Sequence, residues 1–446
     1  MSQFLSQVRL YVLQIYQRVS NQDVGEHMYP KQRMVQMNLK TFVLGSLLPA
    51  PILLLYWAVF LQPDMDTFIF SRTESNASLP TMHYLRCNFN VSIGINVDEF
   101  SQSIKRHSYR SGHGKMKTYS VSDSYGKLGV NDSLLCWEDS KFRETLEKNR
   151  QFIQNYPCGN STPYLEELGL AGHFVDFPNP QIPVLVTAAS SDHFLEVQAQ
   201  MQSLHNVVFP HYKDLKYIFY DIGLNETEKD LVKQNCRCEY RSFPFQKYPE
   251  HVKVLKGYTF KPLIAQTVLN EYGFIMWMDA SVRFRTGKLD TLFEMVIKDE
   301  IKLTQGGLGV GYRTDPVTFK YLGEDPCLYA DKNEIQATFF LVYRTRFTIE
   351  SIMRPWVSCA LTLGCMYYTG SLNRLSCVKQ KGLGFCHRFD QSVMSIILWR
   401  LYHANFGKVL ISGSFFDVQR DHTSRYFESL GNKSNKHFEE NRSHPP

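Results

Sequence analysis

In the stretch Phe274-Ile-Met-Trp-Met-Asp-Ala-Ser281, five apolar residues lead directly into a carboxylate and, two positions later, a hydroxyl. A short apolar run of this kind indicates a strand that is buried on both faces, as in parallel sheets. Side chains two positions apart in an extended chain point to the same side, so Asp279 and Ser281 are expected side by side. Open α/β sheets bind ligands beyond the carboxyl ends of their strands, and Asp279 stands at such an end.

Strands and helices are expected to alternate around this stretch. The expected strands are 183–189, 215–220, 238–245, 273–279 and 408–412, and the expected helices are 194–207, 225–234, 261–272 and 393–402. This alternation implies an α/β fold in which a Rossmann-type, mostly parallel sheet carries helices on both faces.

Asp279 and Ser281 offer oxygen ligands at the end of the central strand. Oxygen ligands suit Mg²⁺ or Mn²⁺, and such a cation eases the departure of a nucleoside diphosphate by neutralising its charge. A lone Asp at the end of a strand is also often a helix cap or a turn former. The pattern therefore leaves a metal site and a local structural role open for Asp279.

Four segments carry a resemblance to a known family: YTFKPLIAQTVL (258–269), FIMWMDASVRF (274–284), QATFFLVYRT (336–345) and FCHRFDQSVMSIIL (385–398). In content and order they resemble a nematode-expanded animal family of type II membrane glycosyltransferase-like proteins with a GT-A, nucleotide-diphospho-sugar transferase domain. The resemblance covers Pro183 to Phe427. It implies an enzyme that moves a sugar from a nucleotide-sugar donor to a glycan or glycoprotein acceptor with the help of Mn²⁺ or Mg²⁺.

The chain departs from the Asp-X-Asp motif of GT-A enzymes at Ser281, where a second Asp is usual. Asp279 and Ser281 remain the candidate ligands for the metal and the nucleotide sugar, and Asp279 is also a candidate catalytic residue. Because a hydroxyl binds a cation less well than a carboxylate, the alternative is a catalytically inactive GT-A-fold module that binds carbohydrate or acts like a chaperone. The sequence contains no nucleophile elbow and no His-Glu-X-X-His helix, which argues against a hydrolase.

Lys261, Asp390 and His422 are the other candidate site residues. Lys261 is a candidate for binding the diphosphate, with a solvated lysine as the alternative. The resemblance implies that Asp390 is the catalytic base or binds the acceptor, although Asp-Gln-Ser-Val before an apolar run is also good N-cap chemistry. His422 is a candidate metal ligand or a surface residue. The glycine-rich run 305–311 is expected to line the acceptor cleft or to form a strand at a close backbone approach.

Residues 41–62, TFVLGSLLPAPILLLYWAVFLQ, contain no charged side chain. About 20 such residues span a bilayer as a helix, although the two prolines here should kink it. Lysines and arginines outnumber acids before this run, and Asp64 and Asp66 follow it, so the N-terminus is expected to be cytoplasmic. We therefore expect a single-pass type II protein of the Golgi or ER membrane. Its segments are a cytoplasmic tail 1–40, a transmembrane helix 41–62, a luminal stem and N-terminal extension 63–182, and a catalytic domain 183–446.

All N-glycosylation sequons and all ten cysteines lie beyond residue 62. The sequons are at Asn76, Asn90, Asn131, Asn160, Asn225, Asn432 and Asn441. N-glycans are added on the luminal side, and an even number of cysteines in an oxidising compartment indicates disulfides. The absence of any CxxC pair disfavours a zinc site. Cysteines before residue 183 and the apolar patch 134–137 indicate that part of 63–182 folds against the main domain.

The composition is that of an ordinary globular protein, with 43% hydrophobic and 21% charged residues. Wholesale disorder is therefore not expected. The formal net charge of +6 is small for 446 residues, and the basic residues are scattered instead of forming a stripe. The sequence accordingly predicts no nucleic-acid partner.

The first prediction concerns topology: the protein should carry N-glycans when it is made in a secretory-pathway host, because every sequon lies beyond the predicted span. Digestion with an N-glycosidase should increase its gel mobility. A variant with Asn→Gln at all seven sequons is the matched control and should migrate like the digested protein. Identical mobility before and after digestion contradicts the predicted topology.

Overall fold

The computed structural model describes residues 115–122, 133–138, 140–159, 161–172, 174, 178–377, 382–411, 414–420 and 423–430. All of them belong to Met82–Pro446, one of the two compact units into which the chain divides. The predicted transmembrane segment 41–62, His422 and every sequon except Asn225 lie outside these ranges. Within the ranges, no helix has both the length and the apolar character that a membrane span requires.

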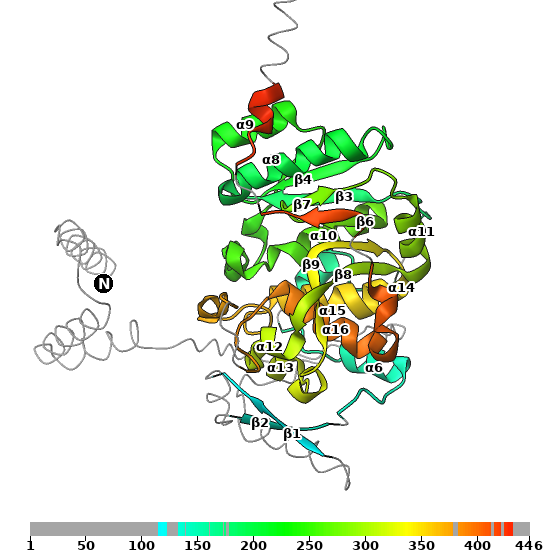
Figure 1. Ribbon diagram of the computed structural model, residues 1–446, viewed down its shortest axis with the longest axis vertical. Helices are drawn as coiled ribbons and strands as arrows, with labels where there is room; N and C mark the ends of the chain where they lie inside the picture. The colour runs from blue at the N-terminus through cyan, green and yellow to red at the C-terminus, as the bar shows by residue number, and fades with distance from the viewer. Residues whose placement is uncertain are drawn as a thin grey trace, which may run out of the picture. The chain divides into compact units, whose positions relative to one another are not determined.

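A six-stranded sheet forms the centre of this unit (Figure 1). Its strands lie in the order β5 (Glu239–Ser242), β4 (Tyr217–Asp221), β3 (Val184–Ala189), β6 (Phe274–Met278), β9 (Asn333–Tyr343) and β8 (Ile301–Gly309). The first four strands are parallel, and β9 is antiparallel to both of its neighbours. The α/β class is confirmed, but the sheet is mixed, because β8 and β9 pair antiparallel. Two antiparallel strands can be connected without the crossover helix that parallel strands need.

The central strand β6 is apolar throughout because both faces of the sheet are buried. Ile275 and Trp277 face one hydrophobic core, whereas Phe274, Met276 and Met278 face the other. These side chains are at most 1% exposed. Complete burial of a large apolar side chain contributes roughly 1.5–3 kcal/mol, so β6 is a major source of stability for the sheet.

Helices cover both faces of the sheet, as expected. One core includes α10 (Phe260–Tyr272), α15 (Arg354–Leu361) and α16 (Asp390–Tyr402). The opposite core includes α8 (Phe194–Ser203), α9 (Glu226–Asn235) and α11 (Asp290–Asp299). Local signals set their ends: Asn225 and Glu228 form a capping box at the start of α9, and Gly273 ends α10 with a φ of 75°.

The remaining elements are shorter. The strands are β1 (Met116–Ser120), β2 (Ser133–Trp137), β7 (Val282–Phe284) and β10 (Phe416–Val418). The helices are α6 (Leu146–Gln154), α7 (Thr162–Glu167), α12 (Val310–Arg313), α13 (Pro316–Leu322) and α14 (Arg346–Thr348). β7 comes directly after the turn that follows β6, and β10 pairs antiparallel with β7.

The predicted elements from 183 to 279 are confirmed, as is the helix after residue 393, but the strand 408–412 is wrong. Residues His403–Val409 form a 3-10 turn, and Leu410 makes only a single bridge, to Leu303. The Leu410 amide bonds back to the Gly407 carbonyl, which closes a turn instead of extending a strand. The glycine-rich run 305–311 does form the end of β8 at a close approach, since a Cβ at Gly306 would lie 2.5 Å from Cγ of Glu334.

The described residues before 183 pack against the main sheet domain. Tyr119 and Leu134 of the β1–β2 pair share a small core with Leu383. The Tyr119 hydroxyl donates to Oδ2 of Asp331 at 2.6 Å, and Cys136 is bonded to Cys327. The expectation that patch 134–137 folds against the main domain is therefore confirmed.

Disulfides connect the described cysteines, as predicted. The pairs are Cys136–Cys327, Cys236–Cys238, Cys359–Cys365 and Cys377–Cys386, and Cys158 is also disulfide-bonded. No cysteine in the described ranges is free.

We expect the Cys136–Cys327 bond to contribute most to stability among these pairs, because it closes a loop of 191 residues. Replacing both cysteines by Ala should lower the free energy of unfolding by about 2–4 kcal/mol in urea denaturation under non-reducing conditions. The matched control is the same double replacement at Cys236 and Cys238, which are two residues apart. Equal losses from the two variants contradict the prediction.

Candidate functional site

Three charged side chains from distant parts of the sequence meet at one end of the central strand. Lys261 Nζ lies 2.9 Å from Oδ1 of Asp279 and 3.0 Å from Oδ2 of Asp390. Asp279 directly follows β6, whereas Lys261 and Asp390 stand in the first turns of α10 and α16. We call Lys261, Asp279 and Asp390 the charge triad.

The charge triad is buried on its inner side and open at Asp279. The side chains of Lys261 and Asp390 are 4% and 5% exposed, whereas that of Asp279 is 29% exposed. Lys261 Nζ also donates to the Ala337 carbonyl at 3.1 Å, and Trp277 Nε1 donates to Oδ1 of Asp279 at 2.8 Å. A buried ammonium is tolerated only where its charge and donors are satisfied, and this arrangement meets that requirement.

The contacts within the charge triad alter the pKa of Lys261 and of Asp390. Burial lowers the pKa of Lys261, but Asp279 and Asp390 together raise it above its ordinary value, so the ammonium stays charged. Burial raises the pKa of Asp390; Lys261 opposes this rise and Asp279 adds to it. Oδ2 of Asp390 makes no directed hydrogen bond within the described residues, so the nearby ammonium is what stabilises its charge.

A tight turn follows β6 and separates Asp279 from Ser281. The Asp279 amide donates to the Thr338 carbonyl at 2.8 Å, and the Val282 amide donates to the Asp279 carbonyl at 3.0 Å. Ser281 is 1% exposed, and its Oγ has no hydrogen-bond partner in the described part of the chain. The expectation that Asp279 and Ser281 lie side by side along an extended chain is wrong, because the strand ends before both residues.

The charge triad lies beside the point where the strand order of the sheet reverses. β4 and β5 follow β3 on one side, and β6 then joins β3 on its other side. In open α/β sheets, ligands bind in the crevice beyond the carboxyl ends of two such strands. His193 lies shortly after β3. The pKa of His193 is raised mainly by its hydrogen bond to Glu196, and the Asp279 charge is a smaller cause.

Two non-glycine residues at the site have left-handed backbone conformations. Tyr258, before α10, has a φ of 52°, and Phe389, before α16, has a φ of 45°. Their ring centroids are 6.3 Å apart, and the Phe389 ring is also 4.6 Å from that of His387. Such conformations cost of the order of 1–3 kcal/mol each and persist where the surroundings impose them. Here they set the first turns of α10 and α16, and thereby Lys261 and Asp390.

Arginines gather next to the charge triad on the α16 side. The Arg388 amide donates to the Arg313 carbonyl at 3.1 Å. The Arg313 guanidinium pairs with Glu334, which also accepts a 2.6 Å bond from Gln391 Nε2. The partly buried Arg388 guanidinium, in contrast, has no hydrogen bond or ion pair with any described residue.

Arg388 shares its electrostatic surroundings with the charge triad. Burial and the Arg313 charge lower the pKa of Arg388, whereas Glu334 and Tyr258 oppose this shift. Burial raises the pKa of Tyr258, and the Lys261 charge opposes this rise. The Tyr258 ring is also 5.5 Å from Lys261 Nζ, so this side chain is a neighbour of the triad.

The predicted Mn²⁺ or Mg²⁺ does not fit the oxygen ligands present here. One oxygen of Asp279 already receives the Lys261 ammonium and the Trp277 indole, and Ser281 is buried. An ammonium 2.9 Å from that oxygen repels a dication on the other one. Across the described ranges, no three His, Cys, Asp or Glu side chains lie close enough to hold a metal ion. The remaining predicted ligand, His422, lies outside those ranges.

Two alternatives left open by the sequence are resolved. Lys261 is not a solvated lysine, since two carboxylates hold its buried ammonium. Asp390 is the first residue of α16 and not its N-cap, a position that Phe389 occupies. A diphosphate contact of Lys261 and proton transfer by Asp390 stay predictions.

Sequence reasoning missed Glu334, Arg313 and Arg388. Arg388 stands two positions before the candidate site residue Asp390, and a cation so close in sequence could have indicated an anion-binding role. Glu334 offers another signal, because a carboxylate near the start of a strand with a long apolar run needs a partner. Arg313 carried no comparable signal, since its pairing with Glu334 depends on the tertiary fold.

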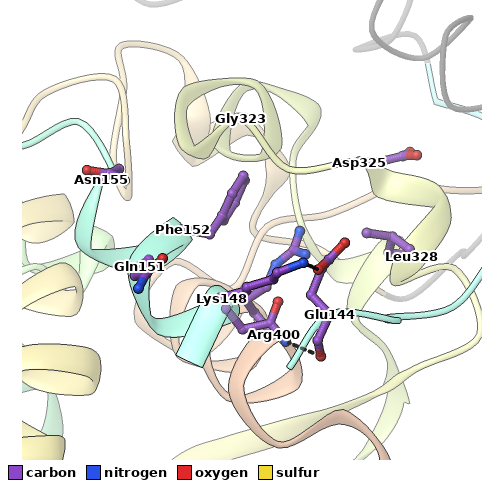
Figure 2. Close-up of a pocket in the computed structure, with 10 residues that line it drawn as sticks. Glu144, Lys148, Gln151, Phe152, Asn155, Gly323, Asp325, Leu328 and Arg400 are labelled. Atoms are coloured by element: carbon purple, nitrogen blue, oxygen red, sulfur yellow. Dashed lines mark hydrogen bonds and ion pairs between the residues drawn. The ribbon is translucent and has the colours of Figure 1, made fainter. Parts of the chain in front are cut away.

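A separate cavity of about 460 Å³ lies toward the other end of α16 (Figure 2). Lys148, Phe152, Asp325 and Arg400 are among the residues that line it, and the Arg400 guanidinium lies 4.5 Å from the Phe152 ring centroid. Arg400 forms a buried ion pair with Glu324. Its position ten residues after Asp390 places it about 15 Å along the helix from the charge triad. This cavity is therefore not part of the candidate site.

One protein family matches part of the sequence: residues 151–266 are similar to a protein of unknown function, DUF1647. The matched part includes β3, β4, β5 and Lys261 but ends before Asp279. A comparison with curated proteins finds no match.

Solved structures of glycosyltransferases are similar to parts of the chain. The bifunctional glycosyltransferase WbbM matches at 11% identity and a TM-score of 0.29, over 42% of this chain and 36% of its own, about a third of its length. The mannosyltransferase Ktr4p from S. cerevisiae matches at 9% identity and a TM-score of 0.34, over 68% of this chain and 80% of its own. Core-mannan synthase A from Aspergillus fumigatus, in its form with Mn and GDP, matches at 11% identity and a TM-score of 0.31, over 56% of this chain and 77% of its own. Scores of this size carry no weight for function, which has to come from the site.

We expect Lys261 to be essential for stability, because its removal leaves two carboxylates buried without a counter-charge. Lys261→Met should lower the free energy of unfolding by about 3–5 kcal/mol in urea denaturation. Adding Asp390→Asn should restore part of the loss, since one of the two charges is then removed. The control is Lys256→Met, at an exposed lysine shortly before the same helix. If the two single variants unfold alike, the triad is not the charge-compensating unit described here.

Proposed function

We propose that this protein is a glycosyltransferase that moves a sugar from a nucleotide-sugar donor to a glycan or glycoprotein acceptor. The observation that carries the proposal is the charge triad at the carboxyl end of β6, beside the reversal of strand order. Open α/β sheets bind nucleotides at this point. The partly exposed carboxylate of Asp279 is an acceptor of the kind that holds the hydroxyl groups of a sugar.

The exposure of each member supports a division of roles within the charge triad. Asp279, at 29% exposure, is the group that we assign to direct substrate contact. Lys261 and Asp390 are almost fully buried, so we assign them to positioning: Lys261 holds Asp279 in place, and Asp390 holds Lys261.

The transfer has a simple balance of bonds. The bond between the anomeric carbon and the diphosphate oxygen breaks, and its electron pair leaves with the nucleoside diphosphate. The acceptor hydroxyl oxygen bonds to the same carbon and loses its proton. An active site has to align both oxygens and stabilise the charge on the leaving group.

We also propose that the described unit faces the lumen of the Golgi or ER, anchored as a type II protein through residues 41–62. The disulfides of the described residues support an oxidising compartment. Asn225 supports it as well, because this sequon is exposed at the start of α9.

Ser281 favours a second candidate, a GT-A-like carbohydrate-binding or chaperone-like module without activity. Its buried hydroxyl stands where a metal-binding carboxylate is usual in the resembled family. Such a module would bind a glycan but neither bind nor turn over a nucleotide sugar.

The test is a screen of the full-length protein, in detergent, for cleavage of individual nucleotide sugars. We expect one donor to be turned over, and we expect Asp279→Asn to lower that turnover by about 10²-fold or more, because an oriented charge at the reacting group is lost. Asp331→Asn, at an exposed carboxylate on the β1–β2 side, is the matched control.

Two outcomes decide against the proposal. If no nucleotide sugar is bound or cleaved while a glycan array shows binding, the inactive module takes its place. If Asp279→Asn and Asp331→Asn have the same activity, the reaction takes place elsewhere on the protein.

A further inference from the structure

The charge triad has no net positive charge with which to balance a leaving diphosphate, since it holds one ammonium and two carboxylates. Its ammonium is buried and already balanced by two carboxylates. Enzymes stabilise such a leaving group with a bound divalent cation or with fixed cationic side chains. Because the oxygen ligands around Asp279 do not fit a divalent cation, the second solution has to be sought among the neighbouring residues.

Arg388 is a cation near the site that forms no ion pair with a described carboxylate. Lys261 is held by two carboxylates, and Arg313 by Glu334. The partly buried guanidinium of Arg388 has no ion pair or hydrogen bond with a described residue. Partial burial removes water from a charge without replacing it, which costs free energy until an anion binds.

The position of Arg388 ties it to the site. It is separated from Asp390 by Phe389 alone, whose left-handed backbone fixes this tripeptide relative to α16. Ser392 Oγ accepts from the Arg388 amide at 3.1 Å, and the same Oγ donates to the Arg313 carbonyl at 2.7 Å. The backbone that carries Arg388 is therefore anchored in place before any ligand arrives.

A further cation adds to the positive character of this region. Arg420 follows β10 and is exposed. Its charge acts on the pKa of both Tyr258 and Arg388, after the larger effect of burial in each case. No carboxylate is paired to Arg388 or Arg420 among the described residues.

We propose that Arg388 binds the diphosphate of the donor, and that transfer at this site proceeds without a divalent cation. The inference rests on the proposed function. A guanidinium presents a planar fork of N–H donors that matches two phosphate oxygens and keeps its charge at any physiological pH. As the bond to the anomeric carbon breaks, the charge that accumulates on the leaving oxygen is stabilised by this fork.

The same chemistry would hold the carboxylate of an acidic sugar on the acceptor, so the experiment separates the two sources. Calorimetry on the full-length protein in excess EDTA measures binding of inorganic pyrophosphate and, separately, of glucuronate. We expect pyrophosphate to bind and glucuronate not to bind. Arg388→Gln should weaken pyrophosphate binding by roughly 10- to 100-fold, the effect of losing hydrogen bonds to a charged group.

Two further variants control the experiment. Arg346→Gln removes an exposed arginine that pairs with Glu350 outside the site and should bind pyrophosphate like wild type. Arg388→Lys keeps the charge but loses the fork, so its affinity should lie between those of wild type and Arg388→Gln. A common melting temperature shows that all variants are folded, as expected for a side chain without structural partners.

The outcomes distinguish this inference from the proposed function. Pyrophosphate binding in EDTA that depends on Arg388, without turnover of any nucleotide sugar, supports the anion site and removes the enzymatic role. Turnover that EDTA abolishes and Mn²⁺ restores keeps the enzyme and overturns the metal-free site. Binding of glucuronate in place of pyrophosphate, or wild-type affinity of Arg388→Gln, also overturns the assignment.

Discussion

The ammonium of Lys261 is the point on which the architecture around the site depends. It contacts the end of β6 through Asp279, the start of α16 through Asp390 and the β9 backbone through Ala337. A buried charge of this kind is costly to leave unpaired, so these elements are held in one arrangement. The same contacts explain how the backbone tolerates left-handed Tyr258 and Phe389 at the heads of the two helices.

The Lys261 ammonium explains why Ser281, and not a second Asp, follows Asp279. Ser281 is fully buried, so an Asp at that position would place a third carboxylate inside the protein without a partner. The Asp-X-Ser pattern therefore belongs with a buried lysine, and the divergence from Asp-X-Asp has an electrostatic reason. Positive charge for a ligand then comes from arginines at the rim, where Arg388 keeps its guanidinium unpaired.

Local patterns predicted the strands and helices well and predicted their assembly poorly. The apolar run of β6 and the proline-led start of α10 are visible in the sequence, so Asp279 and Lys261 were found. The contact between Lys261 and Asp390 joins residues far apart in sequence, and no local pattern encodes it. The antiparallel direction of β9 and the turn after Asp279 were not predicted from the sequence, because long-range packing decides both.

The long disulfide loop has a consequence for biosynthesis. Cys136 emerges from the ribosome 191 residues before its partner Cys327. At roughly 5–20 residues per second, its thiol waits about 10–40 s for that partner, while Cys158 and the closely spaced Cys236 and Cys238 appear earlier. The correct bond therefore forms late, after β8 has been made, and the nascent chain depends on thiol–disulfide exchange to clear premature pairings.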